Sequence, residues 1–188
     1  MLSLFTIHFS LFTAASAQSR DFLTDEEVEL IRDAQQIDLR IDVLTHAIDR
    51  RFEVLKVDVK APPLPKKGAE LWGKLPEGTR LQLLNDIRRI LQKAIDDIDN
   101  LAERPESMVV DPDAEKDKKK QKGYAELFPK AVRSLASAVA RYQPALKMEI
   151  DKTTDNMEKG VILASLEMCD EIAAAAAKLP AEVLRQKH

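Results

Sequence analysis

The chain has 188 residues and a formal net charge of −3, so it lacks the basic excess of a nucleic-acid-binding surface, and we expect no nucleic-acid partner. Its single cysteine excludes an intramolecular disulfide framework. Five glycines and an aromatic content of 5% are low for an all-β protein, so the composition favours an all-α fold.

An apolar segment without a charged side chain covers residues 1–17. Ala15, Ser16 and Ala17 have the small-x-small pattern that signal peptidase requires before its cleavage site, because only small side chains fit its pockets. The segment therefore predicts a signal peptide that is cleaved after Ala17, and export to the periplasm or the extracellular space. It lacks the basic residues that usually precede the apolar run, so the alternatives are an uncleaved membrane anchor or an ordinary buried helix.

A long first helix is predicted from Thr24 to about Lys56. Thr24 and Glu27 have the spacing of a capping box, in which two side chains satisfy backbone amides of the first turn. The apolar residues that follow are spaced three and four apart, which is the period of one buried helix face. They are Ile31, Ala34, Ile37, Ile41, Leu44, Ile48, Phe52 and Leu55.

A connector is expected at about 58–76, because Pro62, Pro63 and Pro65 lack amide donors and disfavour helix before them. Trp72 in this connector could line a ligand pocket. We expect it instead to close one end of the helical core, because a tryptophan brings a large apolar area to a core.

The second helix is predicted over about 77–103, where apolar residues alternate three and four apart in a strict seam. The seam consists of Leu84, Ile87, Leu91, Ala94, Ile98 and Leu101. A second connector at about 105–122 carries charges of both signs and has little to bury, so we expect a solvated loop.

Two further amphipathic helices are predicted, one over about 124–143 and one from Pro144 to about Lys178. Proline is tolerated only near a helix start, so the first helix begins just before or at Pro129, with residues 124–128 as a separate turn. The second continues across Gly160, since an interior glycine costs only about 1 kcal/mol and the apolar phase is kept. Its expected buried face is Leu146, Ile150, Thr153, Met157, Val161, Ala164, Met168, Ile172 and Ala175.

Four amphipathic helices can bury their apolar faces against one another around a shared core. We therefore expect a four-helix bundle with antiparallel helices, in a single domain over residues 18–188. The alternative is an elongated coiled coil in which the first two helices associate with another chain.

Few residues have side chains suited to metal binding or redox chemistry. His46 is the only histidine of the expected helical body, and one histidine does not make a transition-metal site, so we interpret it as a surface or boundary residue. Met148, Met157 and Met168 could bind copper, but the last two lie on the expected core face. Cys169 could form an intermolecular disulfide, although free cysteines are more often buried.

Four acidic residues of the second connector have the spacing of the first ligands of a calcium-binding loop. They are Asp111, Asp113, Glu115 and Asp117. Lys116 and Lys122 stand where such a loop requires glycine and glutamate, so we do not assign a calcium site.

The sequence has no nucleophile-elbow motif, phosphate-binding loop or dinucleotide fingerprint, and we assign no catalytic, cofactor-binding or metal-binding residue. We expect an exported, non-enzymatic protein that binds a partner protein or assembles with itself. One alternative is an envelope protein that binds an apolar ligand or a membrane surface. A more distant one is a metal carrier or enzyme that uses His46, Cys169 and the methionines.

Overall fold

The computed structural model describes residues 20–64, 68–103 and 123–180, and within these ranges all regular structure is helical. The predicted signal peptide, the calcium-like spacing and the connector at 105–122 lie outside the described residues. The all-α fold class is confirmed, with five α-helices packed together and one short 3₁₀ helix. The elements are α1 (Asp25–Asp33), α2 (Ile37–Val54), η1 (Ala69–Trp72), α3 (Arg80–Glu103), α4 (Tyr124–Lys152) and α5 (Asn156–Ala177).

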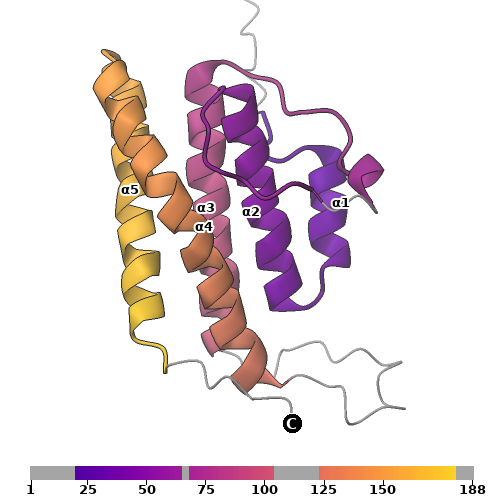
Figure 1. Ribbon diagram of the computed structural model, residues 1–188. Coiled ribbons are helices and arrows are strands. Elements are labelled where there is room, and N and C mark those ends of the chain that lie inside the picture. Colours follow the sequence, from indigo (N-terminus) through magenta and orange to yellow (C-terminus); the bar gives the residue numbers. More distant parts are fainter. Residues whose placement is uncertain (1–19, 65–67, 104–122, 181–188) are drawn as a thin grey trace, which may run out of the picture.

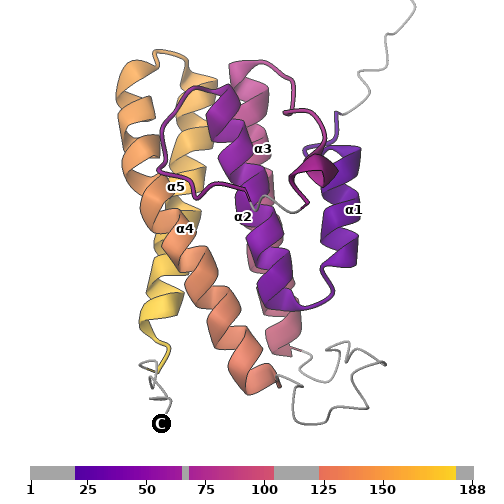
Figure 2. The ribbon, with the colours of Figure 1, turned by 45° about the vertical axis from the view of Figure 1, so that its right-hand side comes forward.

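The four long helices α2, α3, α4 and α5 lie side by side, and consecutive ones run in opposite directions (Figure 1). The helix α2 packs on α3, and α4 packs on α5. Further contacts join α2 to α4 and α3 to α5, and the two helices within each of these pairs run in the same direction. The short helix α1 lies outside this group beside α2, as Figure 2 shows.

The expected single helix from Thr24 to Lys56 is wrong, because the chain leaves the helical conformation at Ala34 and α2 begins only at Ile37. The capping box at the start of α1 is confirmed, since the Thr24 amide donates to the Glu27 side chain at 3.0 Å and the Glu27 amide donates to Thr24 Oγ1 at 3.3 Å. The break lets α1 fold back along α2, so that Glu27 reaches the other end of α2. A straight helix would separate Glu27 and Arg51 by about 36 Å.

The expected helix boundary at Pro144 is also wrong. The helix α4 contains both Pro129 and Pro144 and continues to Lys152. Pro144 deprives the Ala140 carbonyl of its helical donor, but both residues are exposed, so water can replace that donor. The next helix begins where the Asp155 side chain accepts hydrogen bonds from two backbone amides of the first turn of α5.

The buried face of α5 differs from the prediction because the predicted helix boundaries are wrong. Its buried residues are Ile162, Ser165, Cys169 and Ile172. Met157 is 66% exposed, although it belonged to the expected core face. The predicted face assumes a continuous helix through residues 153–155, which are not helical, and of its members within α5 only Ile172 is buried.

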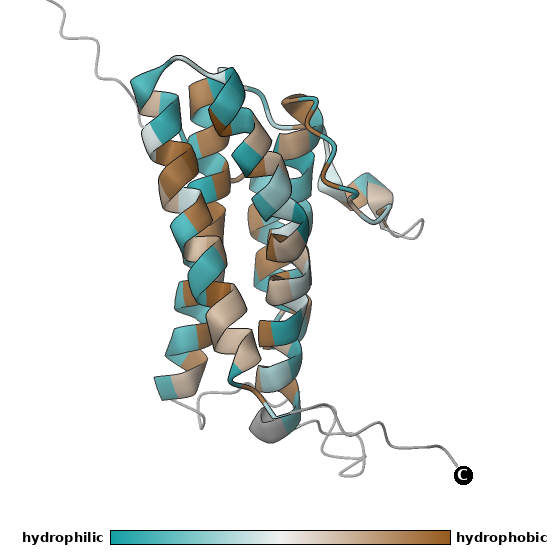
Figure 3. Ribbon diagram, turned by 60° about the vertical axis from the view of Figure 1, so that its left-hand side comes forward, coloured by the Kyte–Doolittle hydropathy of each residue, from teal (hydrophilic) through white to brown (hydrophobic). Residues whose placement is uncertain are grey.

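The core lies between the long helices, whose apolar and polar segments alternate along each ribbon in Figure 3. The predicted seam of α3 is confirmed, since all six of its residues are buried. Trp72 is buried in the same core cluster, as expected. Among the described helices, none is both long enough and apolar enough to cross a membrane.

Candidate functional site

A pocket of about 540 Å³ lies between α2 and the extended chain that follows it. We call residues 56–64 the strap and the cavity the strap pocket. One wall is a single face of α2, whose members are three and four residues apart, namely His46, Asp49, Arg50 and Glu53. The opposite wall is the strap, which contributes Lys56, Val57, Asp58, Val59, Ala61, Pro62, Pro63 and Leu64.

The strap leaves α2 through a left-handed turn at Lys56, whose φ is 58°. The Lys56 amide donates to the Glu53 carbonyl at 3.0 Å, and the Val57 amide donates to the Phe52 carbonyl at 2.9 Å. This pair of bonds is a Schellman motif, which usually places glycine at the left-handed position. The turn reverses the chain and directs the strap back along α2.

Arg141 of α4 fixes the strap to α2. Its guanidinium contacts both carboxylate oxygens of Asp49, at 3.1 and 3.2 Å, and also donates to the Val59 carbonyl at 3.2 Å. Burial alone would lower the pKa of Arg141, but the hydrogen bond to Asp49, together with the charges and hydrogen bonding of Asp49 and Tyr142, outweighs burial and the pKa is raised. Val59 itself is buried, so the middle of the strap is held by both apolar and polar contacts.

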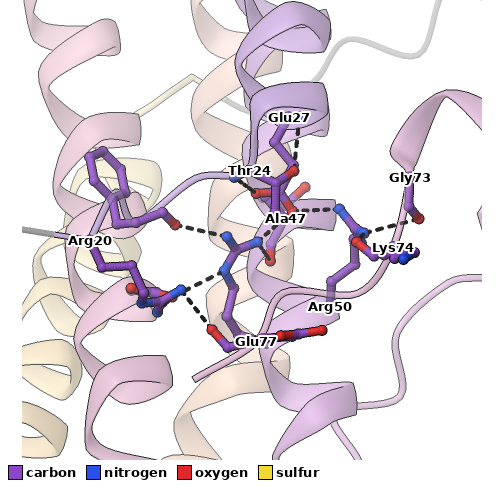
Figure 4. Close-up of polar contacts among 12 residues, drawn as sticks. Arg20, Thr24, Glu27, Ala47, Arg50, Gly73, Lys74 and Glu77 are labelled. Carbon is purple, nitrogen blue, oxygen red and sulfur yellow. Dashed lines mark hydrogen bonds and ion pairs between the residues drawn. The ribbon is translucent and has the colours of Figure 1, made fainter. Parts of the chain in front are cut away.

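Trp72 of η1 lies beside the α2 wall. Its ring is 5.8 Å from that of His46, and the Arg50 guanidinium lies over it at 5.5 Å. Arg50 also donates to Glu27 at 2.7 Å and to the carbonyls of Gly73 and Lys74 (Figure 4). Both terminal nitrogens of Arg50, Nη1 and Nη2, are therefore engaged in holding η1 and α1, which leaves them unavailable to a ligand.

A cluster of buried ion pairs extends from Arg50 away from the pocket (Figure 4). Arg51 donates to Glu27, to the Ala47 carbonyl at 2.8 Å and to the Phe22 carbonyl at 2.7 Å. Its Nε lies 3.8 Å from Asp86 of α3, so this one side chain joins α1, the segment before α1, and α3.

Asp86 also accepts a hydrogen bond from Arg20, which in addition donates to the Glu77 carbonyl at 2.8 Å. Burial raises the pKa of Asp86 more than the charges of Arg20 and Arg51 lower it. The sequence pattern predicted the capping role of Glu27 but not this cluster, because the groups that meet in it belong to different elements of the chain.

Three polar side chains of the strap pocket stay available to a ligand. His46 Nδ1 lies 2.8 Å from the Asp42 carbonyl and donates to it, which leaves Nε2 free to accept a hydrogen bond. No described residue hydrogen-bonds or pairs with the side chains of Glu53 and Lys56, which are both exposed. The pocket thus combines an apolar, proline-containing wall with an imidazole, a carboxylate and an ammonium group. The sequence signal for this wall was the proline cluster, but Glu53 and Lys56 carried no signal of their own.

The structure does not bring the other candidate residues of the sequence together. Met148 is 52% exposed, Met157 is also exposed, and Met168 packs partly buried against the core. Cys169 is fully buried, and burial, with a smaller contribution from Asp170, raises the pKa of its thiol to about 12. Within the described ranges, no group of three or more His, Cys, Asp and Glu side chains could hold a metal ion.

The lining of the strap pocket offers a ligand charged groups, hydrogen-bonding groups and apolar surface. The chain matches no protein-family model, no curated protein and no solved structure.

Proposed function

We propose that this protein is an exported, non-enzymatic helical module that binds a partner protein or a second copy of itself. The observation that carries the proposal is the strap pocket, in which an extended, proline-containing segment faces His46 and Glu53 of α2. Export is inferred from the apolar segment at residues 1–17 and its small residues before position 18.

The composition of the pocket favours a protein segment as its ligand. Pro62 and Pro63 are exposed, and rigid extended segments of this kind lose little entropy when they meet a partner. Beside them, Glu53 and Lys56 offer one charge of each sign. A partner side chain with an apolar stem and a charged head, such as lysine or arginine, could pack on the prolines and pair with Glu53.

The scaffold in this proposal is one domain over residues 18–188. In it, α2, α3, α4 and α5 form the four-helix bundle, and α1 is an addition held by the buried ion pairs. Such a domain unfolds in one cooperative transition, and separate transitions for α1 and for the long helices would contradict the single-domain assignment.

Photo-crosslinking from the pocket tests the proposed binding. The full chain would carry a benzophenone amino acid at Lys56, or in the matched control at the exposed Glu167 of α5. Irradiation in the envelope or culture-medium fraction should give a discrete adduct from position 56 alone, and Glu53→Arg should weaken it. An adduct of twice the chain mass would identify self-assembly. Identical products from both positions would contradict the proposal.

Export is tested separately, by N-terminal sequencing of protein recovered from outside the cytoplasm. The expected sequence begins at Gln18. Exclusive recovery of chains that begin at Met1 from the cytoplasm would contradict export without affecting the strap pocket.

A second candidate function is binding to a membrane surface, and exposed apolar side chains near the α4–α5 connection favour it. Met157 and Leu163 are 66% and 51% exposed, and Met148 lies close to the end of α4. Flotation with lipid vesicles tests this candidate. We expect Met157→Asp together with Leu163→Asp to abolish flotation, whereas a wild-type protein that stays with the soluble fraction would exclude it.

A further inference from the structure

A second, apolar cleft of about 190 Å³ lies where α3, α4 and α5 meet, apart from the strap pocket. Its floor is apolar and is formed by Ile95, Ile98, Val132, Leu135, Ile172 and Ala175. Ala175 belongs to a run of alanines in α5, and these short side chains leave this wall thin. An apolar hollow of this kind is filled favourably by an apolar side chain, because water inside it lacks hydrogen-bond partners.

The rim of the cleft carries two acidic side chains, Asp99 of α3 and Glu171 of α5. Both are exposed, and no described residue pairs with either. An occupant that places basic groups beside an apolar side chain would therefore match the cleft in both shape and charge.

The chain itself supplies such a sequence directly after the described residues. Val183 and Leu184 are apolar, and Arg185 and Lys187 follow them. We propose that the residues 181–188 dock on the cleft of their own chain, with Leu184 in the apolar hollow and the two basic side chains at its acidic rim.

The described chain ends beside α4, one of the three helices that form this cleft. Arg133 of α4 donates a hydrogen bond to the Pro180 carbonyl, and Arg133 is the neighbour of the wall residue Val132. Residue 184 is only four positions beyond this anchor, a span of at most about 14 Å. A segment tethered at this distance has an effective concentration in the millimolar range, so even weak apolar contacts suffice to keep it docked.

The orientation of the docked segment follows from the charges. Burial of Leu184 is the main attraction, and the ion pairs at the exposed rim add a smaller one. Asp99 and Glu171 lie on different helices at the edge of the hollow. Pairing of the two basic side chains with these two acidic ones therefore determines the direction in which the segment lies.

Disulfide trapping in the full chain tests the docking. The variant Leu184→Cys with Asp99→Cys should form an intramolecular disulfide on mild oxidation, seen as a mass loss of two hydrogens in a monomer. The control pairs Leu184→Cys with Glu53→Cys at the strap pocket and should stay reduced. An intermolecular disulfide in the first variant would show that a second copy occupies the cleft. No disulfide, or equal trapping in both variants, would overturn the proposal.

Binding of a neutral apolar dye such as N-phenylnaphthylamine provides a readout without engineered cysteines. Leu184→Asp should release the cleft and raise dye fluorescence several-fold, whereas Gln186→Asp, with the same charge change in the same segment, should leave it unchanged. Circular dichroism would establish that both variants are folded. If Leu184→Asp disturbs folding, the reversal Arg185→Glu should raise dye binding and a second change, Glu171→Lys, should restore it. Unchanged fluorescence in all variants would contradict the docking.

Discussion

The guanidinium of Arg51 donates a hydrogen bond to the carboxylate of Glu27, and neither side chain is exposed to solvent. The two residues lie in different helices, and the same carboxylate also accepts from Arg50. Glu27 thereby serves two structural roles, since it caps its own helix and forms ion pairs with two buried cations. The chain break at Ala34 is what makes this relationship possible.

Glu27→Ala should lower the free energy of unfolding by about 3–5 kcal/mol, because it leaves the buried Arg50 without a carboxylate and leaves the buried Arg51 with Asp86 alone, 3.8 Å from its Nε. Urea denaturation followed by circular dichroism would measure the change. Glu29→Ala is the matched control in the same helix, since its pair with Arg32 is exposed, and we expect an effect below about 0.5 kcal/mol. Equal effects of both substitutions would contradict a stabilising role for the buried cluster.

The thiol of Cys169 should be inert in the native protein. It is fully buried, and its pKa of about 12 leaves almost no thiolate at neutral pH. A colorimetric thiol reagent should therefore react with it only at the rate of unfolding, and rapidly in denaturant. Fast stoichiometric labelling of folded protein, or a covalent dimer on non-reducing gels, would contradict the burial.

Lys56→Gly should raise the free energy of unfolding by about 0.5–1 kcal/mol. Lys56 has a φ of 58°, which a side chain disfavours and glycine adopts freely. The same substitution at the exposed Lys147, in the interior of α4, should instead lower stability by about 1 kcal/mol. Both substitutions remove one lysine charge, so opposite signs of the two changes in the free energy of unfolding would distinguish backbone strain from loss of charge. Equal signs would show that the turn at Lys56 is not strained.

Protonation of Glu149 should account for part of the stability that the protein loses at acid pH. Burial alone would raise its pKa, but hydrogen bonds from Lys152 and Arg80 outweigh it and hold the pKa below the usual 4.5. A carboxyl group whose pKa is lower in the folded state contributes its full stabilisation when the pH is above its pKa in the unfolded chain. That contribution is lost as the pH falls through its pKa in the folded protein.

Glu149→Gln should accordingly be less stable than wild type above pH 4.5 and should show a shallower decline below it, as measured by urea midpoints along a pH series. Glu167→Gln, at an exposed site of α5, should leave both the midpoint and its pH dependence unchanged. A parallel pH series for wild type and Glu149→Gln would contradict the assignment.

Much of the secondary structure could be predicted, because helix periodicity and capping are local properties of the chain. The seam of α3 from Leu84 to Leu101 is buried throughout, and the capping box of Thr24 and Glu27 is formed. The connector containing Pro62 and Pro63 is non-helical, as its missing amide donors require. Trp72 lies in the core, where its apolar area predicted it to be.

The helix boundaries near Ala34 and Pro144 could not be predicted in the same way. At Ala34 the apolar spacing continues without interruption, whereas the pairing of Glu27 with α2 requires a break. At Pro144 the local rule predicted a helix start, yet the exposed Ala140 carbonyl tolerates the missing donor. Both outcomes depend on groups that lie far away in the sequence or on access to water.

The sequence by itself determined an all-α protein with strongly amphipathic helices, since composition and spacing act within each segment. The tertiary structure alone decided which charges are buried, which face of α5 meets the core and where the strap encloses a pocket. Burying a charge such as that of Arg51 depends on a carboxylate brought in from another helix. The position of the strap likewise depends on Arg141, which joins Asp49 and Val59 only in the folded chain.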